Sequence, residues 1–203
     1  SILSGPSFSN EVSQTLPTAV TLATKDKKDF EKISKLIPNK VFRIYYSNDL
    51  IGTQIGGALK NIYAIAAGVA EGLNLGENAK SALISRSFAE MTRYARKFKA
   101  DKNTLFGLSG LGDLILTCSS KNSRNTQFGI KLASSKYNNF LDLLKSQEVT
   151  EGYYTVKAVY NISQKKNIDM PIMESVYNIL YKQHDLKEEL SNLLSRPITE
   201  EKI

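Results

Sequence analysis

The sequence predicts a short α/β segment over residues 1–48, followed by a mainly α-helical domain over residues 49–203. Before residue 49, three runs with the composition of β-strands alternate with two helical patterns. After residue 49, apolar residues recur at steps of three and four, and no further run has the character of a strand. With 203 residues, 41% of them hydrophobic and 23% charged, the chain can bury a full core.

The α/β segment is expected to alternate strand and helix from its first residues. The expected elements are, in chain order, a strand at 1–4, a helix at 8–14, a strand at 17–24, a helix at 26–36 and a strand at 41–46. Gly5-Pro6 marks the turn after the first strand. Because the chain begins inside or just before a strand, we interpret this segment as the end of an open sheet. We expect an N-terminal portion to precede it.

Two long helices are expected next. The first runs from about Leu50 to Ala70, because its apolar side chains form one stripe. The stripe consists of Ile51, Ile55, Leu59, Ile62, Ala66 and Val69. The second runs from Asn78 to Lys99.

Local signals predict the shorter elements. Three glycines between Gly107 and Gly112 predict a turn or tight junction. Ser123 and Asp185 are suitable N-cap residues, and Pro171 suits a first helical turn. Further helices are expected at about 123–133, 141–144, 151–162, 171–180 and 185–194.

The charge balance restricts the partners. A net charge of +7 and a pI near 9.3 are compatible with nucleic acid or with an anionic substrate. In the densest basic run, residues 93–102, Tyr94 and Phe98 share one helical face. They are therefore expected to pack rather than to stack on bases, and we expect no nucleic-acid partner.

Membrane, secreted and metal-binding classes are also disfavoured. The apolar run from Ile51 to Ala70 contains Lys60 and Asn61, so we interpret it as a core helix and expect no membrane association. No signal peptide opens the chain, and the single Cys118 fits a reducing cytoplasm. Because there is only one histidine and one cysteine, no ligand cluster for a metal is expected. His184 is expected in an exposed loop and Cys118 in packed surroundings.

Lys60 stands among small side chains in the first long helix. It shares a face with Gly56, Gly57 and Ala64. A glycine inside a helix costs about 1 kcal/mol relative to alanine, which indicates a steric reason for these two. The reason is either a close helix crossing, with Lys60 extending to water, or the close approach of a ligand.

Ser123, Arg124 and Asn125 form a candidate phosphate site. A guanidinium group pairs bidentately with phosphate oxygens, and the free amides of a helix start favour an anion at the same place. The alternative is a plain serine-capped helix with an arginine in water.

A series of short motifs carries a family resemblance. They are Ser4-Gly5-Pro6-Ser7-Phe8, Leu16-Pro17-Thr18-Ala19-Val20, Asp49…Gly52…Gly57-Ala-Leu-Lys60-Asn61-Ile-Tyr-Ala-Ile-Ala-Ala-Gly68, Gly72-Leu-Asn-Leu-Gly76-Glu-Asn-Ala-Lys80, Gly110-Leu-Gly-Asp113-Leu…Thr117-Cys118, Ser123-Arg-Asn125, Glu151-Gly152 and Met170-Pro171-Ile172. Their joint order and spacing resembles the bacterial NAD(P)-dependent glycerol-3-phosphate dehydrogenases over nearly the whole chain. The resemblance implies the last strands of a Rossmann sheet at 1–48 and, at 49–203, a helical substrate domain like the C-terminal domain of 6-phosphogluconate dehydrogenase.

The resemblance also implies roles for single residues. Lys60 matches the proton-transferring lysine, and Asn61 is expected to buttress it. Asp113 matches a substrate-site carboxylate that orients the lysine or accepts a substrate hydroxyl, and it can also cap a helix after Gly112. Substrate contacts are implied at Gly5, Ser7, Lys60, Asp113, Ser123, Arg124 and Asn125. Cofactor contacts are implied at Ser9, Arg124, Val149 and Glu151.

The implied activity is the interconversion of sn-glycerol 3-phosphate and dihydroxyacetone phosphate with NAD or NADP, which feeds glycerophospholipid synthesis. The family's Gly-rich nucleotide-binding half and its second substrate-site lysine should precede Ser1, so we expect residues 1–203 alone to be inactive. A homodimer is compatible with the sequence. The alternatives are a ketopantoate or hydroxyacid reductase and, from another class, a non-catalytic basic helical binding module.

Overall fold

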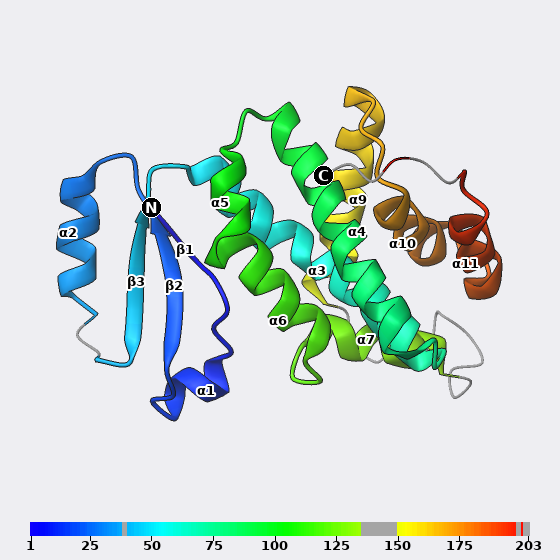
Figure 1. Cartoon of the computed structure of the whole chain (residues 1–203), viewed down its shortest axis with the longest axis horizontal. Coiled ribbons are helices and arrows are strands. Elements are labelled where there is room, and N and C mark those ends of the chain that lie inside the picture. Colours follow the sequence, from blue (N-terminus) through cyan, green and yellow to red (C-terminus); the bar gives the residue numbers. More distant parts are fainter. Residues whose placement is uncertain (38–39, 135–149, 198–199, 201–203) are drawn as a thin grey trace.

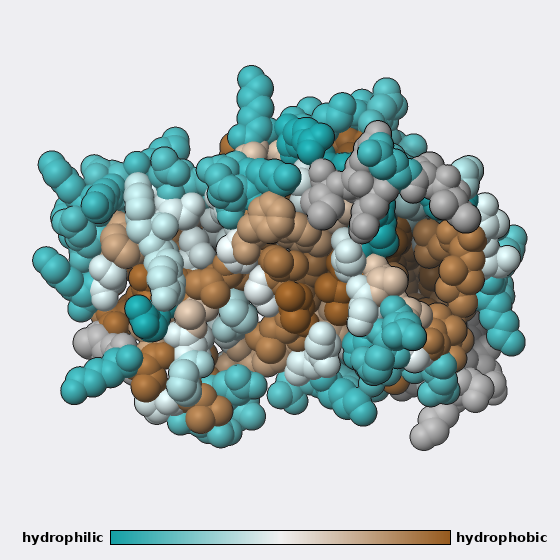
Figure 2. All heavy atoms as spheres, viewed as in Figure 1, coloured by the Kyte–Doolittle hydropathy of each residue, from teal (hydrophilic) through white to brown (hydrophobic). Residues whose placement is uncertain are grey.

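The computed structural model describes residues 1–37, 40–134, 150–197 and 200. A small sheet and helix α2 lie at one end of the molecule, and helices form the rest (Figure 1). This arrangement confirms the predicted fold class, a short α/β segment followed by helices. Figure 2 shows hydrophilic side chains along the upper and lower rims of this face and hydrophobic side chains between them.

The α/β segment follows the predicted order of elements. They are β1 (Ile2–Ser4), α1 (Ser9–Ser13), β2 (Thr18–Ala23), α2 (Lys27–Lys35) and β3 (Phe42–Ser47). In the described sheet β2 is central, antiparallel to β1 and parallel to β3. A parallel pair requires a crossover connection, and α2 provides it. Asp26 starts α2, because its carboxylate accepts a hydrogen bond of 2.8 Å from the backbone N–H of Lys28.

The helical part is built around one long helix. The described helices are α3 (Leu50–Gly72), α4 (Gly76–Lys97), α5 (Lys102–Phe106), α6 (Asp113–Ser119), α7 (Arg124–Ala133), α9 (Glu151–Lys166), α10 (Pro171–Lys182) and α11 (Leu186–Leu194). Helix α3 is in contact with α4, α6, α7 and α9, so it is buried on most of its circumference. Leu59, Ile62, Tyr63 and Ile65 in its middle are almost inaccessible to solvent.

The predicted single apolar stripe on α3 is therefore wrong in part. Ile55, Leu59 and Ile62 are buried as expected, but Ile51 exposes 48% of its surface. Ala64, outside the stripe, is fully buried. The reason is that helices surround α3, which extends the buried surface beyond one face.

Glycines allow neighbouring backbones to touch α3. A Cβ atom at Gly56 would lie 2.1 Å from the carbonyl oxygen of Ser109, and one at Gly68 would lie 2.0 Å from that of Thr126. Side chains at these positions would push the neighbouring segments away. Close packing within the protein is thus the steric reason for Gly56.

Of the two alternatives predicted for Gly107–Gly112, a turn or a tight junction, the structure shows the tight junction. Leu108–Gly112 form one turn of π-helix, which joins α5 to α6 and leads directly into Asp113. Its shape follows from tight packing, since a Cβ atom at Gly110 would lie 2.0 Å from the carbonyl oxygen of Leu105. The helix expected at 141–144 lies outside the described residues.

Candidate functional site

Lys60 and Asp113 form an ion pair between α3 and α6. The Lys60 Nζ atom donates a hydrogen bond of 2.5 Å to Oδ2 of Asp113. The Asp113 side chain is 3% exposed, whereas the Lys60 side chain is 21% exposed and so reaches the surface. A buried carboxylate needs such a partner, because removing it from water without compensation is costly. Lys60 is therefore a cation held in place, with part of its side chain open to solvent.

Thr117 contacts Asp113 from one turn further along α6. Its Oγ1 atom lies 2.6 Å from the backbone oxygen of Asp113 and 3.3 Å from Oδ1 of the same residue. The Asp113 carboxylate thus contacts Lys60 through one oxygen and Thr117 through the other. This arrangement fixes the orientation of the carboxylate and, through it, the position of the Lys60 ammonium group.

Asn61 begins a second set of contacts next to the ion pair. Its Nδ2 atom donates to Oε2 of Glu151 at 3.1 Å, and its Oδ1 atom accepts from Nδ2 of Asn125 at 3.0 Å. The Oδ1 atom of Asn125 accepts from the backbone N–H of Gly152 at 3.0 Å. These bonds join α3, the start of α7 and the start of α9.

Gly152 is required for this junction. A Cβ atom there would lie 2.6 Å from the backbone oxygen of Asn61 and 2.8 Å from Oδ1 of Asn125. The first turn of α9 therefore rests directly on α3, and Glu151, which is exposed, is brought to Asn61.

The start of α7 follows the sequence prediction. Ser123 is buried, and its Oγ atom accepts a hydrogen bond of 3.2 Å from the backbone N–H of Thr126. Arg124 is the first residue of the helix and is exposed. Within the described part of the chain, its side chain makes no hydrogen bond or ion pair. A guanidinium group at an exposed helix start is available to an anion.

The loop after β1 lies beside the same region. Gly5 has φ +147°, and a Cβ atom there would lie 3.0 Å from Cα of Val20, so this position favours glycine. Ser7 is exposed and donates from Oγ to the backbone oxygen of Gly5 at 3.0 Å. The loop approaches the ion pair at Gly112, where a Cβ atom would lie 3.9 Å from Cδ of Pro6.

One expected cofactor residue is not joined to this cluster, and another cannot be placed. Ser9 is exposed at the start of α1, and among the described residues its side chain makes no hydrogen bond. Val149 lies outside the described residues. The structure thus brings together the candidates on α3, α6, α7 and α9, and it leaves Ser9 apart.

Some contacts of this cluster were not anticipated from the sequence. Two such contacts are that of the Thr117 hydroxyl with Asp113 and that of Gly152 with α3. Asp113 and Thr117 are four residues apart, and this spacing on a helix could have indicated the contact between their side chains. Asn125, expected as a substrate contact, uses both polar atoms of its side chain within the protein.

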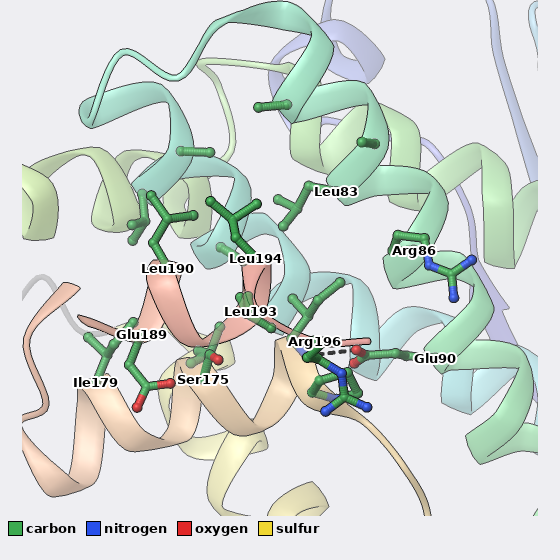
Figure 3. Close-up of a pocket in the computed structure, with 18 of the residues that line it drawn as sticks. Leu83, Arg86, Glu90, Ser175, Ile179, Glu189, Leu190, Leu193, Leu194 and Arg196 are labelled. Carbon is green, nitrogen blue, oxygen red and sulfur yellow. Dashed lines mark hydrogen bonds between the residues drawn. The ribbon is translucent and has the colours of Figure 1, made fainter. Parts of the chain in front are cut away.

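Other features of the described residues lie outside the cluster. A cavity of about 770 Å³ lies between α4, α10 and α11, and Leu83, Leu190 and Leu193 line it together with Arg86 (Figure 3). None of the sequence-predicted site residues borders this cavity. Burial raises the pKa of the Cys118 thiol to about 12, so it remains protonated and unreactive at neutral pH.

His184 lies in an exposed loop, as expected. Its Nδ1 atom lies 2.7 Å from Oε1 of Glu189. Among the described residues, no three His, Cys, Asp or Glu side chains gather where they could hold a metal ion. In the same part of the chain, no helix is long and apolar enough to cross a membrane.

Comparisons with known proteins agree on one family. Residues 49–191 match the family described as the C-terminus of NAD-dependent glycerol-3-phosphate dehydrogenase. A glycerol-3-phosphate dehydrogenase [NAD(P)+] of Solidesulfovibrio magneticus is 46% identical over 98% of this chain and 60% of its own length. The corresponding protein of Colwellia psychrerythraea is 44% identical over 96% of this chain and 58% of its own length.

Solved structures lead to the same family. The crystal structure of glycerol-3-phosphate dehydrogenase from Coxiella burnetii superposes with a TM-score of 0.90 at 38% identity, over 96% of this chain and 59% of that chain. The chain spans about three fifths of the length of the curated relatives it matches. It belongs to the glycerol-3-phosphate dehydrogenase family and corresponds to that family's C-terminal part.

Proposed function

We propose that this chain carries the substrate-binding and proton-transferring part of an NAD(P)-dependent glycerol-3-phosphate dehydrogenase. The reaction would interconvert sn-glycerol 3-phosphate and dihydroxyacetone phosphate and supply glycerophospholipid synthesis. The observation that carries the proposal is the Lys60–Asp113 pair, buried on one side and reaching solvent on the other, in a chain of this family. We assign residues 1–48 to the end of a nucleotide-binding domain and residues 49–203 to the substrate domain.

Lys60 is the proposed acid and base. When the ketone is reduced, its ammonium group would donate a hydrogen bond and then a proton to the carbonyl oxygen. When the alcohol is oxidised, the neutral amine would take the hydroxyl proton. Asp113 and Thr117 would hold the Lys60 Nζ atom in position during both directions.

The start of α7 is the proposed phosphate site. Arg124 would pair with two phosphate oxygens, and the free amides of the first helical turn would donate to the phosphate group. Ser123 and Asn125 belong to this site. Because the Asn125 side chain is already engaged by Asn61 and Gly152, we propose that it contributes through the position of the helix start. Gly5 and Ser7 complete the substrate site from the loop after β1.

The residues present fit one end of a nicotinamide dinucleotide. Glu151 is exposed at the start of α9 and accepts a hydrogen bond from Asn61. Arg124 is exposed at the start of α7, next to Asn125, which is also bonded to Asn61. We propose that these two residues, together with Ser9 and Val149, hold NAD or NADP. When bound, the cofactor would supply hydride to the ketone carbon or accept it from the alcohol carbon.

The test is a hybrid enzyme. Residues 1–203 would be joined to the N-terminal portion of the Solidesulfovibrio magneticus relative that lies outside the match. We expect the hybrid to oxidise NADH or NADPH with dihydroxyacetone phosphate. Residues 1–203 alone should show no measurable turnover, because the pyrophosphate of the dinucleotide is normally cradled by a strand-loop-helix unit that precedes this region. The N-terminal portion alone is the matched control.

The outcomes also separate the alternatives. A folded hybrid that reduces ketopantoate or an unphosphorylated 2-oxo acid, and ignores dihydroxyacetone phosphate, would favour a related reductase. Salt-sensitive binding of a short DNA duplex, without any turnover, would favour a basic binding module. Robust NADH oxidation by residues 1–203 alone would show that the cofactor site has been misassigned.

We also propose that the enzyme acts in the cytoplasm as a homodimer. The buried thiol of Cys118 is consistent with a reducing compartment. Light scattering of the hybrid enzyme measures its oligomeric state. A monomer at micromolar concentration would contradict the proposed homodimer.

A further inference from the structure

Thr126 joins the start of α7 to the end of α6. It is fully buried, and its backbone N–H donates to the Ser123 hydroxyl, so it belongs to the capped first turn of α7. Its own hydroxyl donates a hydrogen bond of 2.7 Å to the backbone oxygen of Thr117. This oxygen lies in the last turn of α6, where carbonyl groups have no partner within the helix. The hydroxyl of Thr126 therefore satisfies the end of one helix from the start of the next.

This bond extends the contacts of the Lys60–Asp113 pair. Thr117 accepts from Thr126 through its backbone and contacts the Asp113 carboxylate through its side chain. Asp113 in turn accepts from Lys60. A continuous series of hydrogen bonds thus runs from the Lys60 ammonium group, through α6, to the helix start that carries Arg124.

The first turn of α7 is fixed on its other sides as well. The backbone oxygen of Thr126 lies against Gly68 of α3, where a Cβ atom would be only 2.0 Å away. Asn125 is bonded to Asn61 on α3 and to Gly152 at the start of α9. Of these anchors, only the Thr126 hydroxyl acts between α7 and α6, the helix that holds Asp113.

We propose that Thr126 is a positioning residue, which fixes the distance between the Lys60–Asp113 pair and the phosphate-binding start of α7. This inference rests on the proposed function. A substrate held by its phosphate group at Arg124 presents its reacting carbon to Lys60 only if α6 and α7 keep their register. A displacement of about 1 Å can lower the rate of a catalysed reaction about 100-fold, so a single hydrogen bond that sets this distance has a measurable effect.

The experiment compares substitutions of Thr126 in the hybrid enzyme. Thr126→Val keeps the shape of the side chain and removes the hydroxyl, and Thr126→Ser keeps the hydroxyl. We expect Thr126→Val to lower kcat/KM for dihydroxyacetone phosphate about tenfold, with the KM for NADH changed less than about twofold. Thr126→Ser should retain kcat/KM within about twofold, because it still donates to Thr117.

Thr92→Val is the matched control. Thr92 is also buried, and its Oγ1 atom donates to the backbone oxygen of Phe88 at 2.9 Å within α4, a helix that holds none of the proposed site residues. Both valine variants should lower the melting temperature, but only Thr126→Val should lower kcat/KM. If Thr126→Val does not fold, Thr126→Cys, whose thiol is a weaker donor of similar size, should give a smaller loss of kcat/KM.

Each outcome decides a separate point. An active hybrid in which Thr126→Val, or Thr126→Cys in its place, keeps full kcat/KM would overturn the positioning role and leave the proposed function intact. Equal losses in the Val and Ser variants would also overturn it, because the effect would not depend on the hydroxyl. An inactive unsubstituted hybrid would instead overturn the proposed function, and the inference with it.

Discussion

Asp113 and Glu90 are both buried carboxylates of the helical part, and they differ in what compensates their charge. Asp113 exposes 2% of its surface and is paired with the ammonium group of Lys60. Glu90 exposes 1% and accepts hydrogen bonds from the backbone N–H groups of Ile172 and Met173, at 2.7 and 3.1 Å. The Tyr63 hydroxyl also donates to Oε2 of Glu90, at 3.4 Å. Asp113 is thus hydrogen-bonded to a cation, whereas Glu90 is hydrogen-bonded to neutral donors.

Asp113 belongs to the candidate site, whereas Glu90 joins two helices of the fold. Glu90 satisfies two amides at the start of α10, where the helix dipole also favours an anion. Figure 3 shows Glu90 beside the cavity between α4 and α10, which Lys60 does not line. Burial raises the pKa of Glu90 to about 7, and the two backbone hydrogen bonds oppose this rise. Burial alone therefore does not distinguish the two carboxylates, whereas the hydrogen-bonded cation of Asp113 does.

The largest effect is expected when the cation is removed from the Asp113 pair. In the hybrid enzyme, Lys60→Ala should lower kcat for reduction of dihydroxyacetone phosphate by about 100-fold or more, the range for loss of general acid–base catalysis. Steady-state kinetics at saturating NADH measures this loss of kcat. Lys187→Ala, at an exposed position on α11, is the control and should keep full activity. A Lys60→Ala enzyme with nearly unchanged kcat would remove Lys60 from the mechanism.

Glu90 should make the stability of residues 1–203 depend on pH. Its folded-state pKa, about 7, lies above the ordinary value of 4.5, so the folded state holds more protons than the unfolded state between these values. This contribution to the free energy of unfolding is present at low pH and decreases as the pH rises through 7. Between pH 5 and pH 7 the loss should be about 2 kcal/mol.

Urea unfolding of the unsubstituted chain and of Glu90→Gln at both pH values measures this contribution. The difference in pH dependence between the two proteins isolates Glu90 from the other acids. Glu77→Gln, at an exposed position of α4, should leave the pH dependence unchanged. Parallel stability profiles for Glu90→Gln and the unsubstituted chain would show that Glu90 titrates normally in the folded state.

The sequence predicted the elements whose signals are local. Ser123 caps α7, Pro171 is the first residue of α10 and Asp185 caps α11, all as expected. The order of strands and helices before residue 49 was also predictable, because strand composition and turn residues are local properties. The candidate pair of Lys60 and Asp113 required the family resemblance, since 53 residues separate the two partners along the chain.

What the sequence could not predict depends on tertiary packing. A glutamate at position 90 of an amphipathic helix has the pattern of a surface residue, and its role appears only when α10 begins beside it. The π-helical turn before Asp113 depends on close contacts of Gly110 and Gly56 with neighbouring backbones. The bond from Thr126 to Thr117 depends on the angle between two helices, which no local pattern specifies.

The smallest effect is expected at Arg124, whose charge is compensated by neither a carboxylate nor a backbone group among the described residues. Asp113 and Glu90 have their partners within the chain, so an exposed cation at a helix start is left to a ligand. In the hybrid enzyme, Arg124→Lys should raise the KM for dihydroxyacetone phosphate about three- to tenfold, because an ammonium group cannot pair with two phosphate oxygens in the bidentate way of a guanidinium group. The kcat should change little, since the phosphate contact is the same in the ground and transition states.

Arg96→Lys, at an exposed position of α4, is the matched control. An unchanged KM for dihydroxyacetone phosphate would move the phosphate site away from Arg124, and a loss confined to kcat would instead connect Arg124 with the reacting carbon.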